Sequence, residues 1–132
     1  LFLNRGEAAA LVELDEESEV DTLLSALAER LPEVEIVLTL GRDGVCHQLA
    51  GERISASAHQ VEAVDTTAAG DTFIGYFMAA RQRGDDIEQA LRLASAASAL
   101  CVQQAGAAPS IPLADAVEAA LDSLPPLSVE RT

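Results

Sequence analysis

The segment from Glu35 to Leu40, EIVLTL, is the feature that most restricts how this chain can fold. Its apolar residues follow one another without the alternation that a half-exposed strand shows. Such a run fits a strand that is buried on both faces of a parallel sheet. Upstream, apolar residues between about Ser18 and Leu31 recur at helical spacing, and Pro32 lies just past the end. A helix followed by a fully buried strand predicts an α/β fold.

Elsewhere in the chain, the pattern predicts strands mainly in the first half and helices mainly in the second half. We expect a strand ending at Leu3, a short helix over GEAAALVEL, a hairpin of Val45–Leu49 and Arg53–Ala58, and helices over Asp71–Arg83, from Asp85 or Asp86 to about Gln104, and over Leu113–Leu124. No internal repeat and no linker interrupts this order. Residues 1–132 are therefore predicted to be a single partial domain, with a loose tail over about 125–132.

Composition narrows the possible partners. Acids number 22 against 8 Lys plus Arg, giving a net charge of −14, which argues against nucleic-acid or anionic-membrane partners. No apolar stretch reaches the roughly 20 residues that a membrane span needs. Only 3% of residues are aromatic, so alanine-rich, closely packed helices are expected. Cys46 and Cys101 lack the spacing of a metal site or a disulfide framework and are interpreted as buried thiols. Because free thiols are typical of reducing compartments, we expect a cytoplasmic protein.

The stretch DTTAAGDTF places Asp71 directly after three small residues, where a helix is about to begin. The first N–H groups of a helix have no partner inside it, and that end is partly positive. The small side chains of Ala68, Ala69 and Gly70 leave these groups uncovered, which suits a phosphate or a developing oxyanion. An acid beside an anion repels it, but it is useful if it takes a proton from an attacking hydroxyl. The alternative is that Asp71, Thr66 or Thr67 only caps the helix.

Four motifs together resemble a known family. AVDTTAAGDTF is similar to the D-T/S-x-x-A/G-G-D-x-F signature of the ribokinase-like (PfkB) carbohydrate kinases. Asn4 and Glu7 match its N-x-x-E, the segment from Thr39 to Gly44 matches T-L-G-x-x-G, and GAAPSIP resembles a ribokinase G-A-x-P-S-x-P. The motifs occur in the family's order over residues 1 to about 122. The last of them favours ribokinase over fructokinase or nucleoside kinase.

The resemblance implies the C-terminal part of a three-layer α/β/α sandwich with a mostly parallel sheet, and a kinase that moves the γ-phosphate of ATP to a sugar hydroxyl. Asp71 would be the general base, and Ala68, Ala69 and Gly70 with the Asp71 amide would form the anion hole. Asn4 would lie near the nucleotide, and Glu7 would hold Mg²⁺ through water. From the residues alone, Asn4 and Glu7 also fit a helix cap.

Further site residues are implied by the same resemblance. Thr39, Gly41 and Gly44 would contact the nucleotide at the end of a strand, although a G-R-D-G segment alone is only a turn. Ser95 would lie beside adenine, or would simply allow close helix packing. The resemblance also implies a monovalent cation such as K⁺, which would bind at Asp65, Thr67, Val102, Ala105 and Ser110. A turn residue is the alternative for Asp65.

The chain departs from the family in length. Family proteins are roughly twice as long, and their first part supplies the Gly-Gly substrate motif, most sugar contacts and a β-lid. We therefore expect a missing N-terminal half or a partner chain that supplies it, a homodimer when complete, and little activity from this chain alone. The alternatives are a non-catalytic nucleotide-binding module and an acidic interaction domain without a ligand. His47 and His59 match no family motif and are expected at the surface or partly packed.

Overall fold

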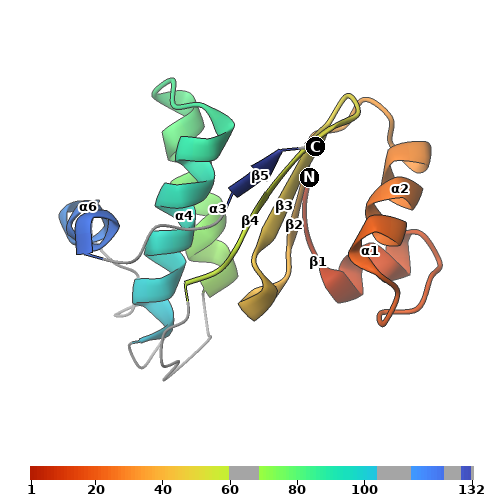
Figure 1. Ribbon diagram of the computed structural model, residues 1–132, viewed down its shortest axis with the longest axis horizontal. Coiled ribbons are helices and arrows are strands. Elements are labelled where there is room, and N and C mark those ends of the chain that lie inside the picture. The colour runs from red at the N-terminus through yellow and green to blue at the C-terminus, as the bar shows by residue number, and fades with distance from the viewer. Residues whose placement is uncertain (60–68, 104–113, 124–128, 132) are drawn as a thin grey trace.

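The described chain folds as three layers, with a sheet between two helices on one side and three on the other (Figure 1). The computed structural model describes residues 1–59, 69–103, 114–123 and 129–131. The elements are β1 (Phe2–Asn4), α1 (Arg5–Leu11), α2 (Val20–Arg30), β2 (Ile36–Thr39), a 3₁₀ turn (Gly41–Asp43), β3 (Val45–Leu49), β4 (Glu52–Ala56), α3 (Ala69–Gln82), α4 (Ile87–Val102), α6 (Ala114–Ser123) and β5 (Val129–Arg131). The predicted α/β class is confirmed.

The sheet has the strand order β1-β2-β3-β4-β5. β1 and β2 are parallel, with Phe2 opposite Val37 and Asn4 opposite Thr39. The pairs β2–β3, β3–β4 and β4–β5 are antiparallel. The predicted hairpin is confirmed as β3 and β4. The described sheet is therefore mixed, whereas the family resemblance implied a mostly parallel sheet. Its parallel part is the β1–β2 pair, because a short turn after β2 leads the chain directly back as β3.

β2 separates two apolar clusters. Ile36 and Leu38 pack with Ala8, Leu24 and Leu27 on the side of α1 and α2. Val37 faces the other side, in the cluster that contains the buried side chains of α3 and α4. Successive strand residues point to opposite faces, so an unbroken apolar run must be covered twice. The prediction of a strand buried on both faces is confirmed.

α4 is the most enclosed helix of the described chain. It packs against α3, α6 and the β4 strand. Its buried residues are mostly alanine: Ala90, Leu91, Leu93, Ala94, Ser95, Ala96, Ala97, Ala99 and Cys101. Small side chains allow neighbouring helix backbones to approach closely, as the composition predicted. Both Cys46 and Cys101 are buried thiols.

Two helix boundaries differ from the sequence prediction. The first helix was predicted to continue over GEAAALVEL, but α1 ends at Leu11, and Glu13 takes a left-handed conformation with φ 57°. α3 begins at Ala69 rather than Asp71. Ala69 and Gly70 therefore belong to the first helical turn.

Two further expectations were wrong. Residues 129–131 were assigned to a loose tail, but they form β5, which pairs with β4 from Ile54 to Ala56. His47 was expected at the surface or partly packed, but it is only 4% exposed and its Nε2 lies 2.7 Å from Glu35 Oε1. Both errors concern contacts between residues far apart in the chain. None of the helices in the described parts of the chain combines the length and apolar character that a bilayer crossing requires.

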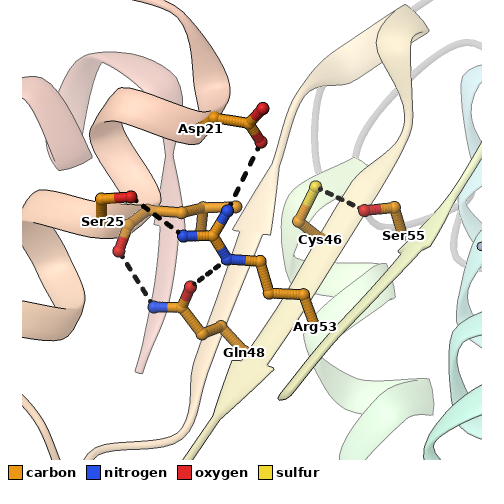
Figure 2. A network of polar contacts seen from close by, with 7 residues as sticks. Asp21, Ser25, Cys46, Gln48, Arg53 and Ser55 are labelled. Atoms are coloured by element: carbon orange, nitrogen blue, oxygen red, sulfur yellow. Dashed lines mark hydrogen bonds and ion pairs between the residues drawn. The ribbon is translucent and has the colours of Figure 1, made fainter. Parts of the chain in front are cut away.

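A polar network joins α2 to the β3–β4 hairpin (Figure 2). The buried Gln48 amide donates to the Leu24 carbonyl at 3.0 Å, and its oxygen accepts from Arg53 Nε at 2.6 Å. The same guanidinium donates to Ser25 Oγ at 3.1 Å and meets Asp21 at 3.4 Å. Since the Asp21 side chain is 89% exposed, solvent screens that ion pair. Gln48 is therefore the buried member of the network, and Arg53 links it to Ser25 and Asp21.

We predict that Gln48→Leu lowers the free energy of unfolding by about 1–3 kcal/mol, because it removes a charge-assisted hydrogen bond and leaves Arg53 without its inner partner. Asp21→Asn, at the exposed end of the same network, should change stability by less than about 1 kcal/mol. Urea unfolding followed by circular dichroism measures both. Equal losses for the two variants would contradict the greater contribution of the buried Gln48 contact.

Candidate active site

The carboxyl ends of β1 and β2 bring two predicted residues to one edge of the sheet. Asn4 is the register partner of Thr39 in this parallel pair. The Thr39 hydroxyl donates to the Leu3 carbonyl at 3.3 Å, which ties the two strands at this edge. Open α/β sheets bind their ligands beyond the carboxyl ends of their strands.

The turn after β2 is pressed against the end of β4. The Gly44 amide donates to the Gly41 carbonyl at 3.3 Å, and the Leu40 amide donates to the Gly44 carbonyl at 2.8 Å. Gly44 has φ 105°, and a Cβ atom there would overlap the carbonyl oxygen of Ala56. Glycine is required at this position both by its backbone conformation and by the close approach of β4.

The start of α3 is open on one side and anchored on the other. Gly70 and Asp71 are exposed, and among the described residues no atom outside the local helix backbone and the chain neighbours lies within 4 Å of a Cβ built on Gly70. On the packed side, the Thr72 hydroxyl donates to Cys101 Sγ at 3.5 Å, and Ser98 Oγ donates to the Ala69 carbonyl at 3.4 Å. Contacts with α4 therefore hold the first turn of α3 in place while its end faces open space.

A cleft of about 270 Å³ lies where these parts meet. In Figure 1 the 3₁₀ turn, the end of β4, the start of α3 and the end of α4 all lie at the lower edge of the view. The described residues that line the cleft are Thr39, Gly41, Arg42, Gly44, Val45, Ala58, His59, Ala69, Gly70, Phe73, Ser95, Ser98, Ala99 and Val102. The structure thus brings together four of the five predicted nucleotide residues (Thr39, Gly41, Gly44 and Ser95) and two predicted for the anion hole (Ala69 and Gly70).

The charge of the cleft contrasts with that of the chain. Although the net charge is −14, no described residue that lines the cleft is an acid. The ionisable side chains of its described lining are Arg42 and His59. Asp71 is exposed next to Gly70, at the border rather than in the lining. The arrangement leaves room for an anion in an otherwise strongly acidic protein.

Asn4 and Glu7 form a reciprocal helix cap at the start of α1. Glu7 N donates to Asn4 Oδ1 at 2.8 Å, and Asn4 N donates to Glu7 Oε1 at 3.0 Å. The capping alternative is therefore confirmed for both residues. The Mg²⁺ role stays a prediction. It is compatible with the cap, because Glu7 is exposed and its carboxylate uses only Oε1 in the capping bond.

Several predicted site residues lie outside the described residues: Asp65, Thr67, Ala68, Ala105 and Ser110. Of the expected cation site, the structure describes Val102, which lines the cleft. Within the described ranges, no group of three or more His, Cys, Asp or Glu side chains is arranged to hold a metal. A Mg²⁺ site of few carboxylates completed by water and phosphate does not need such a group.

Arg42, His59 and Ser98 are cleft residues that sequence reasoning missed. Arg42 lay in a segment interpreted as a turn, and Ser98 in a run of small helical residues. His59 was expected to be partly packed, which its intermediate burial confirms, but its place in the cleft was not predicted. Burial lowers the pKa of His59 from its usual value through desolvation. The sequence signal for it was only its position shortly after the hairpin.

Comparison with known proteins places this geometry in a family. The model of the pfkB family carbohydrate kinases matches residues 1–114. The chain belongs to the pfkB carbohydrate kinase family. This pfkB chain is 40% identical over 113 residues to a ribokinase of Schizosaccharomyces pombe, a match that covers 85% of the chain and 34% of that protein.

Solved structures agree with the family assignment. The pfkB chain superposes on Arabidopsis thaliana ribokinase, solved with ribose and ATP, with a TM-score of 0.85 and 34% identity over 92% of the chain and 40% of that structure. An E. coli protein solved with ATP and Mg²⁺ gives a TM-score of 0.78 and 28% identity, covering 92% of the chain and 38% of that structure. The chain thus has the ribokinase-like fold and spans about a third of the curated S. pombe relative, 34% of its length.

We predict that Gly44→Ala destabilises the chain by about 3 kcal/mol or more, because the new methyl group meets the Ala56 backbone in a conformation that strains any side chain. Gly41→Ala is the matched control. Gly41 also has a positive φ, 57°, but nothing lies within 4 Å of its Cβ position. Its cost should be about 1–2 kcal/mol. Thermal unfolding of both variants tests the difference, and equal losses would contradict the close approach of β4.

Proposed function

We propose that this chain is the nucleotide-binding and catalytic part of an ATP-dependent sugar kinase, most similar to ribokinase. The observation that carries the proposal is the open start of α3 at Gly70, on the same cleft as the Gly41–Gly44 turn. The cleft would take the nucleotide, and the helix start would receive the phosphoryl group that moves.

The anion hole would consist of N–H groups in the first turn of α3. These groups have no partner within the helix, and the helix dipole makes them favourable for negative charge. No side chain of the described residues covers Gly70, which would let a phosphoryl group approach the backbone. The contacts of Ser98 and Cys101 in α4 with Ala69 and Thr72 in α3 support a preorganised site, whose donors need not rearrange as charge develops.

Asp71 would be the general base. The sugar hydroxyl oxygen attacks the γ-phosphorus, the bond from that phosphorus to the β–γ bridging oxygen breaks, and ADP leaves with that oxygen. The hydroxyl proton passes to the Asp71 carboxylate. Support for this role comes from the exposure of Asp71 beside Gly70, within the first turn of α3.

Glu7 and Asn4 would hold Mg²⁺ and its waters at the neighbouring edge of the sheet. When bound, Mg²⁺ neutralises part of the charge on the ATP phosphates. The exposed Glu7 carboxylate fits a metal that prefers oxygen ligands and keeps several waters. A K⁺ ion near Val102 stays a prediction, because the other proposed ligands lie outside the described residues.

The sugar would be ribose or a similar sugar with a primary hydroxyl, since the Arabidopsis ribokinase of the same fold was solved with ribose and ATP. Sugar recognition would come from a part of the kinase beyond these residues or from a partner chain, in a homodimer. A fructokinase or nucleoside kinase of the same family is the nearest alternative. A non-catalytic nucleotide-binding module is another alternative. Turnover separates that module from a kinase.

We predict that Asp71→Asn in the whole protein keeps nucleotide affinity and lowers kcat roughly 100- to 10,000-fold, because the amide cannot accept the hydroxyl proton. Asp115→Asn is the matched control, since Asp115 is also an exposed acid in the first turn of a helix, α6. It should leave kcat unchanged. Steady-state kinetics with ATP and ribose measures both variants. Normal turnover of Asp71→Asn would remove the base assignment.

We predict that Glu7→Gln shifts the Mg²⁺ dependence of the reaction to higher concentration. Glutamine at this helix position keeps the capping pattern, so the change removes charge without removing the cap. The melting temperature should stay close to that of the unaltered protein, while the Mg²⁺ titration moves. An unchanged titration would count against a metal role for Glu7.

A further inference from the structure

His59 is the cleft residue whose hydrogen bonding is incomplete. Its Nε2 atom is shielded from solvent and has no hydrogen-bond partner in the described structure. A polar atom buried without a partner costs free energy, and a bound ligand that supplies the partner recovers it. The free protein therefore leaves one shielded nitrogen for a ligand in the cleft to satisfy.

The other histidine shows what a satisfied buried imidazole looks like in this chain. His47 lies beside Glu35, with Nε2 2.7 Å from Oε1, and its ring lies near Phe77. It needs no ligand to complete its contacts. Within the described ranges, His59 has no comparable carboxylate at its Nε2 atom. The two histidines are close in the chain, since His47 lies in β3 and His59 follows β4 of the same hairpin.

The surroundings of His59 fit a neutral, flat group. Apolar side chains of the cleft include Val45, Phe73, Ala99 and Val102. Desolvation lowers the pKa of His59, so its imidazole is neutral at pH 7.5. A neutral imidazole nitrogen in an apolar wall pairs well with the hydrogen-bonding edge of a heterocyclic base. It would pair poorly with a phosphate, which loses its hydration there.

Two other polar side chains of the cleft already have backbone partners. Thr39 donates to the Leu3 carbonyl, and Ser98 donates to the Ala69 carbonyl. The open end of α3 is suited to phosphate instead of base. In comparison with these two described side chains, His59 keeps a shielded polar atom without a partner.

We propose that His59 hydrogen-bonds the base of the bound nucleotide through Nε2 and thereby contributes to nucleotide affinity. The assignment rests on the proposed function, since it requires that the cleft take a nucleotide. It concerns binding, and His59 takes no part in the phosphoryl transfer.

The test compares two ligands on the 132-residue chain by calorimetry at pH 7.5: Mg-ATP, and Mg-tripolyphosphate, which lacks base and ribose. His59→Phe keeps a planar ring of similar size and removes both nitrogens. It should weaken Mg-ATP binding by about 5- to 30-fold, the effect of losing one buried hydrogen bond, and leave Mg-tripolyphosphate binding unchanged. His59→Gln introduces a side-chain amide that can hydrogen-bond the base, so it should recover part of the lost Mg-ATP affinity.

His47→Gln is the matched control, because it removes the histidine that already has a partner and does not line the cleft. It should lower the melting temperature without changing Mg-ATP affinity.

The outcomes separate this assignment from the function on which it rests. If the unaltered folded chain binds neither ligand, the nucleotide site and the His59 contact are both wrong. If it binds Mg-ATP and His59→Phe binds it equally well, only the His59 assignment is overturned. A loss of equal size for both ligands also overturns it, because His59 would then act on the phosphates.

Discussion

The two-sided burial of β2 is the constraint on which the rest of the structure depends. Ile36 and Leu38 need cover from α1 and α2, while Val37 needs cover from the side of α3 and α4. Water is therefore excluded from both faces of β2 only when both helix layers are in place. The same packing places the carboxyl end of β2, with Thr39 and the turn that follows, beside the start of α3. The position of the candidate site therefore follows from the packing of the helices on both faces of β2.

Close packing of helices then sets the shape of the cleft. α4 is built largely of alanine on its buried surfaces, and it contacts α3 with Ser98 near Ala69 and Cys101 near Thr72. Since these side chains are small, α3 begins close to the end of α4, with Gly70 still uncovered. Larger residues along this contact would separate the helices and move the first turn of α3 away from the Gly41–Gly44 turn.

Charge is distributed so that an acidic protein keeps an acid-free cleft within the described residues. The net charge of −14 would repel an anionic ligand if the acids lined the cleft. Asp71 lies at the border of the cleft, where it could act as the proposed base, and Arg42 belongs to the lining. Composition alone would have suggested poor binding of anions. The cleft differs from that expectation, because the described residues that line it include no acid.

Local patterns in the sequence determined the elements and most of the candidate site. The apolar run of β2, the helix spacing and the Asn4–Glu7 cap act over a few neighbouring residues, so they can be read from the chain. Motif order also placed Thr39, Gly41, Gly44, Ser95 and Gly70, which the cleft brings together.

Only the tertiary structure decided the contacts between distant segments. The burial of His47 against Glu35, the pairing of β5 with β4 and the shielded, partnerless Nε2 of His59 leave no local pattern. Gly44 fits its family motif, but the reason that it must be glycine is the backbone of Ala56. Such contacts depend on which surfaces meet when the core closes, and the sequence around either partner does not reveal the other.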